Sequence, residues 1–390
     1  MRGHVGAGTR RSHALALVIA LCCALLASWS PPCAHADEPA KAPDEPAKAP
    51  DGPAASGLEV SATVFPAIVY TPETSLLFAF GGFWIFKDLE QPPDVLPSSL
   101  LVGATYTLRG QILGIAKPEL FWEQGRHHAL LEIGYEYTPT SFFGVGNEQA
   151  LAQEEEYAAR VARLETLVER RMWRRLSLGV VSETRHERFV ELEPDGELAL
   201  GGLRGSRGGW ISGVGASAAW DARDSAFQPT DGVWARLTAS NYAPWLGSDF
   251  RFWQAILDAR AYWPFWGEQV LAVQGWTHLQ GGGVPFQRLA TVGGSERLRG
   301  VFGGRFRDRR ALVAQVEHRW PLWWRFGLVE FLGVGRVWDD WRDLASDGWH
   351  PAGGVGLRFL ADEPNRVNLR FDVGIAEDEV NFYLNFLEAF

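Results

Sequence analysis

Residues 251–263 alternate between apolar and polar side chains and carry a tryptophan near each end, which strongly limits the possible folds. One face holds Trp253, Ala255, Leu257, Ala259, Ala261 and Trp263, and the other holds Gln254, Asp258 and Arg260. A period of two indicates a β-strand. The two tryptophans span roughly 33 Å along a strand, or about 25 Å when the strand is tilted by ~40°. That is the height of the lipid-facing band of an outer-membrane β-barrel, which has aromatic side chains at both rims.

The rest of the chain fits the same class. It contains 18 Trp, 23 Phe and 43 Gly, and no apolar run after the first 36 residues approaches the ~18 residues of a membrane-spanning helix. A secreted β-protein and an outer-membrane β-barrel both fit this composition. The small alanines between Trp253 and Trp263 favour the barrel, because they are tolerated against lipid and fill a packed core poorly.

The first 36 residues predict a signal peptide. A basic start precedes an apolar run over 14–28, and Ala34-His35-Ala36 is a cleavage signal, so we expect the mature chain to begin at Asp37. The basic residues are Arg2, Arg10 and Arg11, and all three cysteines (Cys22, Cys23 and Cys33) also lie in this segment. The mature chain would therefore have no disulfide, and its negative charge does not suggest a nucleic-acid partner.

Residues 37–57 predict a linker. The sequence Asp-Glu-Pro-Ala-Lys-Ala-Pro occurs twice in tandem, at 37–43 and 44–50. Its proline, alanine and charge content offers little to bury, so we expect an extended, disordered spacer. The barrel domain is then expected over 58–390.

Alternating runs between turn signals predict sixteen strands, an even number as in bacterial outer-membrane barrels. The runs are 59–70, 75–87, 98–109, 111–122, 127–138, 155–171, 173–187, 209–220, 232–243, 249–264, 268–280, 309–322, 325–338, 350–361, 366–376 and 379–390. With the N-terminus in the periplasm, segment 281–308 joins strands eleven and twelve. It is therefore expected to be the sixth extracellular loop.

Three features conflict with this assignment. Residues 154–176 have the local pattern of a helix, and Pro66 in the first strand removes a hydrogen-bond donor. Glu330 falls on the lipid face of strand thirteen, where a charge is expensive. We interpret Glu330 as the mark of a bulge or of a shifted register.

The loop segment 292–310 is rich in glycine and arginine. A cationic run cannot form a core, and a glycine-rich run is a poor helix. Taken alone, these residues predict a solvated loop. If the barrel lumen is lined with carboxylates, the arginines of this loop could instead pair with them in partly desolvated sites.

Three motifs together resemble the BamA/TamA family of outer-membrane barrels, also called bacterial surface antigens. Trp220-Asp221-Ala222-Arg223-Asp224, with Pro229 and Gly232, is similar to the family's turn between strands eight and nine. Leu298-Arg299-Gly300 is similar to the family's Arg-Gly loop motif, and Phe386 and Phe390 resemble its terminal strand signal. The resemblance covers most of 58–390.

The resemblance implies that the sixth loop folds into the barrel lumen and that Arg299 pairs with acids on strands twelve and thirteen. The first acid corresponds to Glu317, and the second position is Gly333, where the acid is absent. We therefore expect a simplified loop-to-lumen contact, made by Arg299 and Gly300 with Glu317 as the one acid. The motif from Asp221 to Gly232 is expected to brace the periplasmic rim.

The sequence also differs from many members of this family in one respect. Members that handle client proteins carry periplasmic receptor (POTRA) domains, whereas only residues 37–57 separate the predicted signal peptide from the barrel. The chain is therefore interpreted as a member lacking POTRA domains.

Two functions remain open. The first is insertion or translocation of polypeptides at a weak seam between the first and last strands, which Pro66 favours. It would involve outer-membrane lipid, client proteins and a separate periplasmic chaperone. The alternative is a stand-alone pore or structural surface antigen, plugged by its own loop.

We expect no enzyme. The histidines are found in no nucleophile–base arrangement, and no metal-binding motif such as His-Glu-x-x-His occurs. No cofactor or metal is expected.

Overall fold

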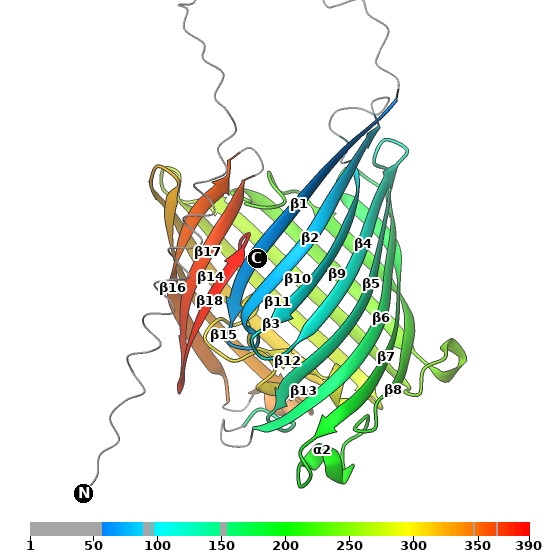
Figure 1. Cartoon of the computed structure of the whole chain (residues 1–390). Coiled ribbons are helices and arrows are strands. Elements are labelled where there is room, and N and C mark those ends of the chain that lie inside the picture. Colours follow the sequence, from blue (N-terminus) through cyan, green and yellow to red (C-terminus); the bar gives the residue numbers. More distant parts are fainter. Residues whose placement is uncertain (1–56, 89–94, 96, 149–153, 346–347, 364–365) are drawn as a thin grey trace, which may run out of the picture. The chain divides into compact units, whose positions relative to one another are not determined.

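Sixteen antiparallel strands close into one barrel in a computed structural model (Figure 1), as the alternation predicted. The structure describes residues 57–88, 95, 97–148, 154–345, 348–363 and 366–390. The predicted signal peptide and all but the last residue of the predicted linker lie outside the described residues. The order around the barrel is β1, β18, β17, β16, β15, β14, β11, β10 and then β9 down to β2.

The strand bounds lie within about five residues of those predicted. The strands are β1 (Leu58–Thr71), β2 (Ser75–Asp88), β3 (Ser98–Thr107), β4 (Ile112–Trp122), β5 (His127–Phe142), β6 (Glu155–Arg171), β7 (Leu176–Leu192), β8 (Gly209–Asp221), β9 (Gly232–Tyr242), β10 (Phe252–Pro264), β11 (Val270–Gly282), β14 (Arg310–Trp323), β15 (Phe326–Trp338), β16 (His350–Asp362), β17 (Val367–Ala376) and β18 (Glu379–Phe386). Between β11 and β14, β12 (Ala290–Val292) and β13 (Phe306–Asp308) form a separate two-stranded sheet.

The helices are short and lie in the loops. They are α2 (Glu197–Leu200) and the 3-10 turns η2 (Pro244–Leu246), η3 (Phe286–Arg288) and η4 (Trp341–Ala345). In the described part of the chain, no helix has the length and apolar character to cross a membrane. The four longest connections between barrel strands, including the one with α2, share one end of the barrel, and turns such as 123–126 and 172–175 lie at the other. In outer-membrane barrels, the short turns are periplasmic.

β6 shows how barrel closure overrides local helix propensity. It pairs with β5 and β7 along its whole length. Arg163 bonds with Glu132 and Glu136 of β5, whereas Leu164 and Val168 are exposed on the opposite, outer face. Successive side chains of a strand point to opposite faces of the sheet, as they do here, whereas those of a helix do not.

The interpretation of Glu330 as a bulge is wrong. The register of β14 and β15 is continuous from Arg310↔Trp338 to Pro321↔Gly327, and it shifts only between Pro321 and Trp323. Glu330 lies opposite His318 on the outer face, with its Oε2 atom 3.8 Å from His318 Nδ1 and its side chain 54% exposed. The carboxylate is therefore lipid-facing, with a histidine beside it.

Candidate functional site

The connection between β11 and β14, residues 283–309, folds into the barrel, and we call it the lumen loop. Its apolar residues Val292, Leu298, Val301 and Phe306 are buried in one cluster with inward-facing residues of the barrel wall, such as Val313 and Val337. Burial of this kind excludes the solvated loop that the glycine and arginine content alone predicted.

Arg299 lies at the centre of the lumen loop's polar contacts and is 1% exposed. Its guanidinium donates one hydrogen bond to Glu317 of β14 and a second, 2.8 Å long, to Asp372 of β17. It also lies over the ring of Phe331, 3.7 Å from the centroid. The expectation of a single acid is therefore wrong, because a second acid comes from a different strand.

Leu298 occupies the space beside Gly333, where the family resemblance placed the second acid. A Cβ atom at Gly333 would lie 3.1 Å from Leu298 Cδ1 and 3.1 Å from Gln315 Cβ. One at Gly335 would lie 2.8 Å from Leu298 Cδ2. The glycines of β15 thus make room for an apolar side chain of the loop, and a carboxylate would not fit beside it.

Gly300 allows the loop backbone to lie against β17. Its φ of +114° is in a region that side chains rarely adopt, and a Cβ atom there would lie 2.9 Å from the carbonyl carbon of Ile375. The Gly300 amide donates to the Tyr383 hydroxyl at 3.0 Å, and its carbonyl accepts from Asn381 at 2.7 Å. Both backbone polar groups are therefore satisfied by β18.

The Arg299 pair belongs to a larger buried network. Glu317 also accepts from Arg319 at 2.7 Å. Arg358 of β16 donates to Asp372 at 2.6 Å and to Glu388 at 2.8 Å. These carboxylates are each at most 3% exposed. The network joins the loop, three strands and the C-terminal residues, and the desolvated charges require each other as partners.

Sequence reasoning missed Asp372, Arg358 and Glu388. Alternation in 366–375 placed Asp372 on the polar face of its strand, and that was the available signal. It could not reveal which lumen groups meet, because the partners come from strands far apart in the chain.

The lumen loop also contacts residues on both sides of the β1–β18 junction. The Gly303 amide donates to Glu73, in the β1–β2 turn, at 2.6 Å. The Phe302 amide donates to Glu379 of β18 at 2.7 Å, and Arg305 donates to Asp378 at 2.7 Å. That hydrogen bond from Arg305 holds the pKa of Asp378 below its ordinary value. The loop thus bridges the two sides of the junction at its extracellular end.

The turn motif of residues 221–232 is closed by its own side chains. Asp221 accepts from Arg223 Nε at 3.0 Å, and Asp224 accepts from the Thr230 amide and hydroxyl at 2.8 and 2.7 Å. Burial opposes ionisation of Asp224, but its hydrogen bonds from Thr230, Asp231 and Arg366 hold its pKa below the ordinary value. Gly232 has a φ of +107°, and a Cβ atom there would overlap the Ala222 carbonyl.

Pro229 connects this turn to the lumen network. Its carbonyl accepts a hydrogen bond from Arg319 at 3.2 Å, and the same guanidinium donates to the Phe390 carbonyl at 2.8 Å. Arg319 therefore links Glu317, the periplasmic turn and the C-terminus.

The expectation that Phe390 closes the last strand is wrong. β18 ends at Phe386, and Leu387 has a φ of 65° that turns the chain out of the sheet. Phe390 is buried in a cluster with Tyr262, Val270 and Ala272, whereas Phe386 remains 40% exposed. Arg319 binds the Phe390 carbonyl and so holds this residue against the inner wall.

Comparison with known proteins shows the family. The Omp85 superfamily domain matches residues 141–387. The chain belongs to the Omp85 superfamily. It is thus a barrel of the bacterial outer membrane, in a family associated with insertion or translocation of polypeptides, and the resemblance found in the motifs is confirmed.

Solved structures show the same fold. BamA from Haemophilus ducreyi, solved without POTRA domains 1–3, superposes with a TM-score of 0.60 at 14% identity, over 85% of this chain and 70% of that one. CdiB from Acinetobacter baumannii superposes with a TM-score of 0.51 at 11% identity, over 85% of this chain and 65% of that one. No curated protein matches the sequence. The described residues contain no group of three or more acidic, histidine or cysteine side chains that could hold a metal.

Proposed function

We propose that this Omp85 barrel inserts or translocates polypeptides through a seam between β1 and β18. The observation that carries the proposal is the pairing at this junction, where Tyr70↔Leu384 is the one register pair. On its other side, β1 pairs with β2 from Leu58↔Asp88 to Thr71↔Ser75. The backbone donors and acceptors along the free edge of β1 can therefore pair with an incoming strand.

Pro66 supports an open edge. It lies in the part of β1 that pairs with β2 and has no register partner on β18. Because proline has no amide hydrogen, it weakens ladder formation and is found at edge strands. A seam held by few hydrogen bonds separates at a lower free-energy cost than any other junction in this barrel.

The lumen loop would set how far the seam opens. Gly303 binds Glu73 on the β1 side and Phe302 binds Glu379 on the β18 side, so the loop holds the extracellular end together. The proposed opening begins at the periplasmic end and is complete only when these contacts and the Tyr70↔Leu384 pair separate. A periplasmic chaperone would deliver the clients, and the braced turn of residues 221–232 would keep that rim in shape.

A disulfide across the seam tests this function. Tyr70→Cys with Leu384→Cys places two cysteines at directly opposed positions, where Cα atoms lie about 4.5–5.5 Å apart, within disulfide range. In cells lacking the native copy, the oxidised variant should fail to restore the outer-membrane protein profile, and reduction should restore it. The matched control is Phe371→Cys with Leu384→Cys, which joins opposed residues of β17 and β18. A cross-linked seam that fully supports the profile would refute the proposal.

A plugged pore is the second candidate, and the buried loop favours it. Because the loop fills the lumen with apolar and ion-paired side chains, we expect low conductance in planar bilayers and a clear rise when 293–308 is deleted. Altered permeability with an unchanged outer-membrane protein profile would support this function over the first.

A further inference from the structure

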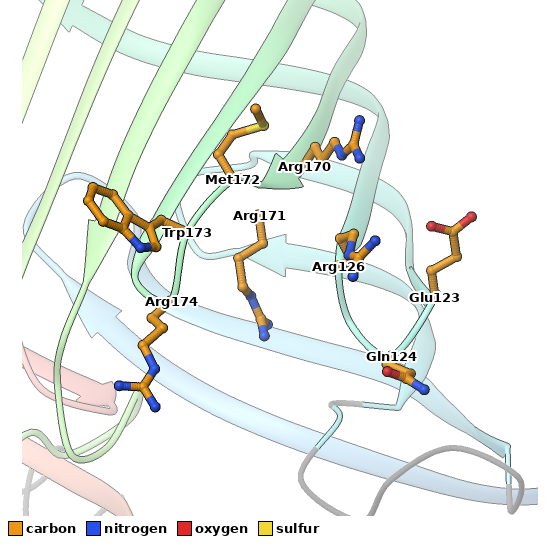
Figure 2. Close-up of a pocket in the computed structure, with 8 residues that line it drawn as sticks. All are labelled: Glu123, Gln124, Arg126, Arg170, Arg171, Met172, Trp173 and Arg174. Carbon is orange, nitrogen blue, oxygen red and sulfur yellow. The ribbon is translucent and has the colours of Figure 1, made fainter.

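Two neighbouring turns at the short-turn end of the barrel carry a dense group of arginines. The turns are residues 123–126, between β4 and β5, and residues 172–175, between β6 and β7. They line a cavity of about 460 Å³ (Figure 2). Its charged lining residues are Glu123, Arg126, Arg170, Arg171 and Arg174. The lining thus has a formal charge of +3, in a chain whose net charge is -10.

The charged side chains of these arginines form no ion pair in the fold. In the part of the chain that the structure describes, no acidic side chain forms an ion pair with Arg126, Arg170, Arg171 or Arg174. All four are exposed. By contrast, most arginines of the lumen network are paired, as Arg319 and Arg358 are. Exposed, unpaired like charges this close repel each other, and an anion would relieve that repulsion.

The backbone fixes the two turns against each other. Glu123, Gln124 and Gly125 all have positive φ values, of 50°, 59° and 68°. The Arg171 amide donates to the Arg126 carbonyl at 2.7 Å, and the Met172 amide donates to the Leu176 carbonyl at 2.9 Å. The cationic group is therefore built on a closed pair of turns, which lowers the entropy cost of binding.

The position of the cavity indicates a membrane ligand. Arg170 lies two residues from Val168, which is 50% exposed on the lipid face. Met172 and Trp173, which also line the cavity, are 57% and 72% exposed. Exposed tryptophan is typical of the membrane–water interface. Figure 2 shows Trp173 and Met172 on the same turn as Arg174.

The other short turns lack this charge. The turn after β10, Phe265 to Gln269, contains Glu268 and no lysine or arginine. In the turn between β14 and β15, Arg325 is paired with Glu363 at 3.3 Å. The positive charge is therefore local to the β4–β5 and β6–β7 turns and is not a general property of the rim.

We propose that this cavity binds the phosphate of an anionic phospholipid headgroup in the periplasmic leaflet. Guanidinium groups donate several hydrogen bonds in a fork that matches phosphate geometry. Arg126, Arg171 and Arg174 reach the phosphate from the turns. Arg170, Met172 and Trp173 contact the glycerol and the start of the acyl chains. The site is separate from the seam and does not depend on the function proposed above.

The test measures lipid bound to the purified protein in phosphatidylcholine nanodiscs that contain a small fraction of phosphatidylglycerol. Retained phosphatidylglycerol is counted by native mass spectrometry. Because losing one hydrogen-bonded contact between a guanidinium group and the phosphate weakens binding by about five-fold, Arg174→Gln should weaken phosphatidylglycerol binding about five-fold. Arg171→Gln with Arg174→Gln should weaken it about thirty-fold. Heat-modified gel migration shows that each variant remains a folded barrel.

Arg325→Gln is the matched control, because it removes the same charge from another turn of the same rim, outside the cavity. It should leave phosphatidylglycerol binding unchanged. Equal losses in Arg325→Gln and Arg174→Gln would show a general surface charge and overturn the proposal. Displacement of the lipid by millimolar inorganic phosphate would assign a free-phosphate site instead. Binding of a polyglutamate peptide with no preference for phosphatidylglycerol would assign a protein partner, and either result would refute the lipid site.

Discussion

Arg299 and Asp372 lie 2.8 Å apart inside the barrel, and both side chains are fully buried. Arg299 comes from the lumen loop and Asp372 from β17. Their contact fixes the loop to the part of the wall next to β18, where the seam lies. Glu317 binds the same guanidinium from β14, so one arginine joins the loop to two strands of the wall.

Removing the charge of Asp372 should lower the free energy of unfolding. Asp372→Asn leaves Arg299, Arg358 and Arg370 with one carboxylate fewer, and breaking a buried pair typically costs about 3–5 kcal/mol. We expect that loss in the free energy of unfolding, measured in urea, and faster proteolysis of the lumen loop. Asp339→Asn, which removes the half-exposed partner of Arg309, should cost less than about 1 kcal/mol. Equal resistance to protease in Asp372→Asn and the native protein would contradict the role of this contact.

Gly333→Asp should not strengthen the loop contact, although it introduces the acid that the family resemblance implied. The new Cβ atom would lie 3.1 Å from Leu298 Cδ1, and overpacking of this kind costs about 1–3 kcal/mol. A double-mutant cycle with Leu298→Ala measures the coupling. Gly333→Asp should cost less in the Leu298→Ala background, and a cost independent of residue 298 would show that the clash is not the cause.

The barrel could be predicted from the sequence because its strands have a period of two. Lipid and lumen impose this period on each strand separately, so Trp253 and Trp263 could be placed without knowledge of any partner strand. The strand over 155–171 is predicted correctly despite its local helix pattern, because the barrel needs a strand there to close. The lumen contacts could not be predicted in the same way. Asp372 and Glu388 meet Arg358 only after the strands are arranged, and strand periodicity contains no information on such pairs.

The C-terminal residues show a second limit, because the predicted strand runs to Phe390 although both the alternation and β18 end at Phe386. Leu387 leaves the sheet, and Arg319 binds the Phe390 carbonyl. Phe390→Ala should therefore lower the free energy of unfolding by about 3–5 kcal/mol, as for a core phenylalanine. Phe386→Ala removes a partly exposed ring and should cost less. Urea unfolding of both variants gives the comparison, and a larger loss for Phe386→Ala would place Phe390 outside the packed cluster.

The contact between Arg305 and Asp378 should make the lumen loop sensitive to acid. The hydrogen bond from Arg305 lowers the pKa of Asp378 in the folded protein. A carboxylate with a depressed folded pKa stabilises the fold above its unfolded pKa, about 3.9, and that contribution is lost as the pH falls through the folded value. The stability difference between the native protein and Asp378→Asn should be constant from pH 8 to about pH 5 and should shrink as the pH falls below about 4. With Arg305→Gln in both proteins, the pH dependence of that difference should disappear. A difference that stays the same from pH 8 to pH 2 would mean that the charge of Asp378 is not what Arg305 binds.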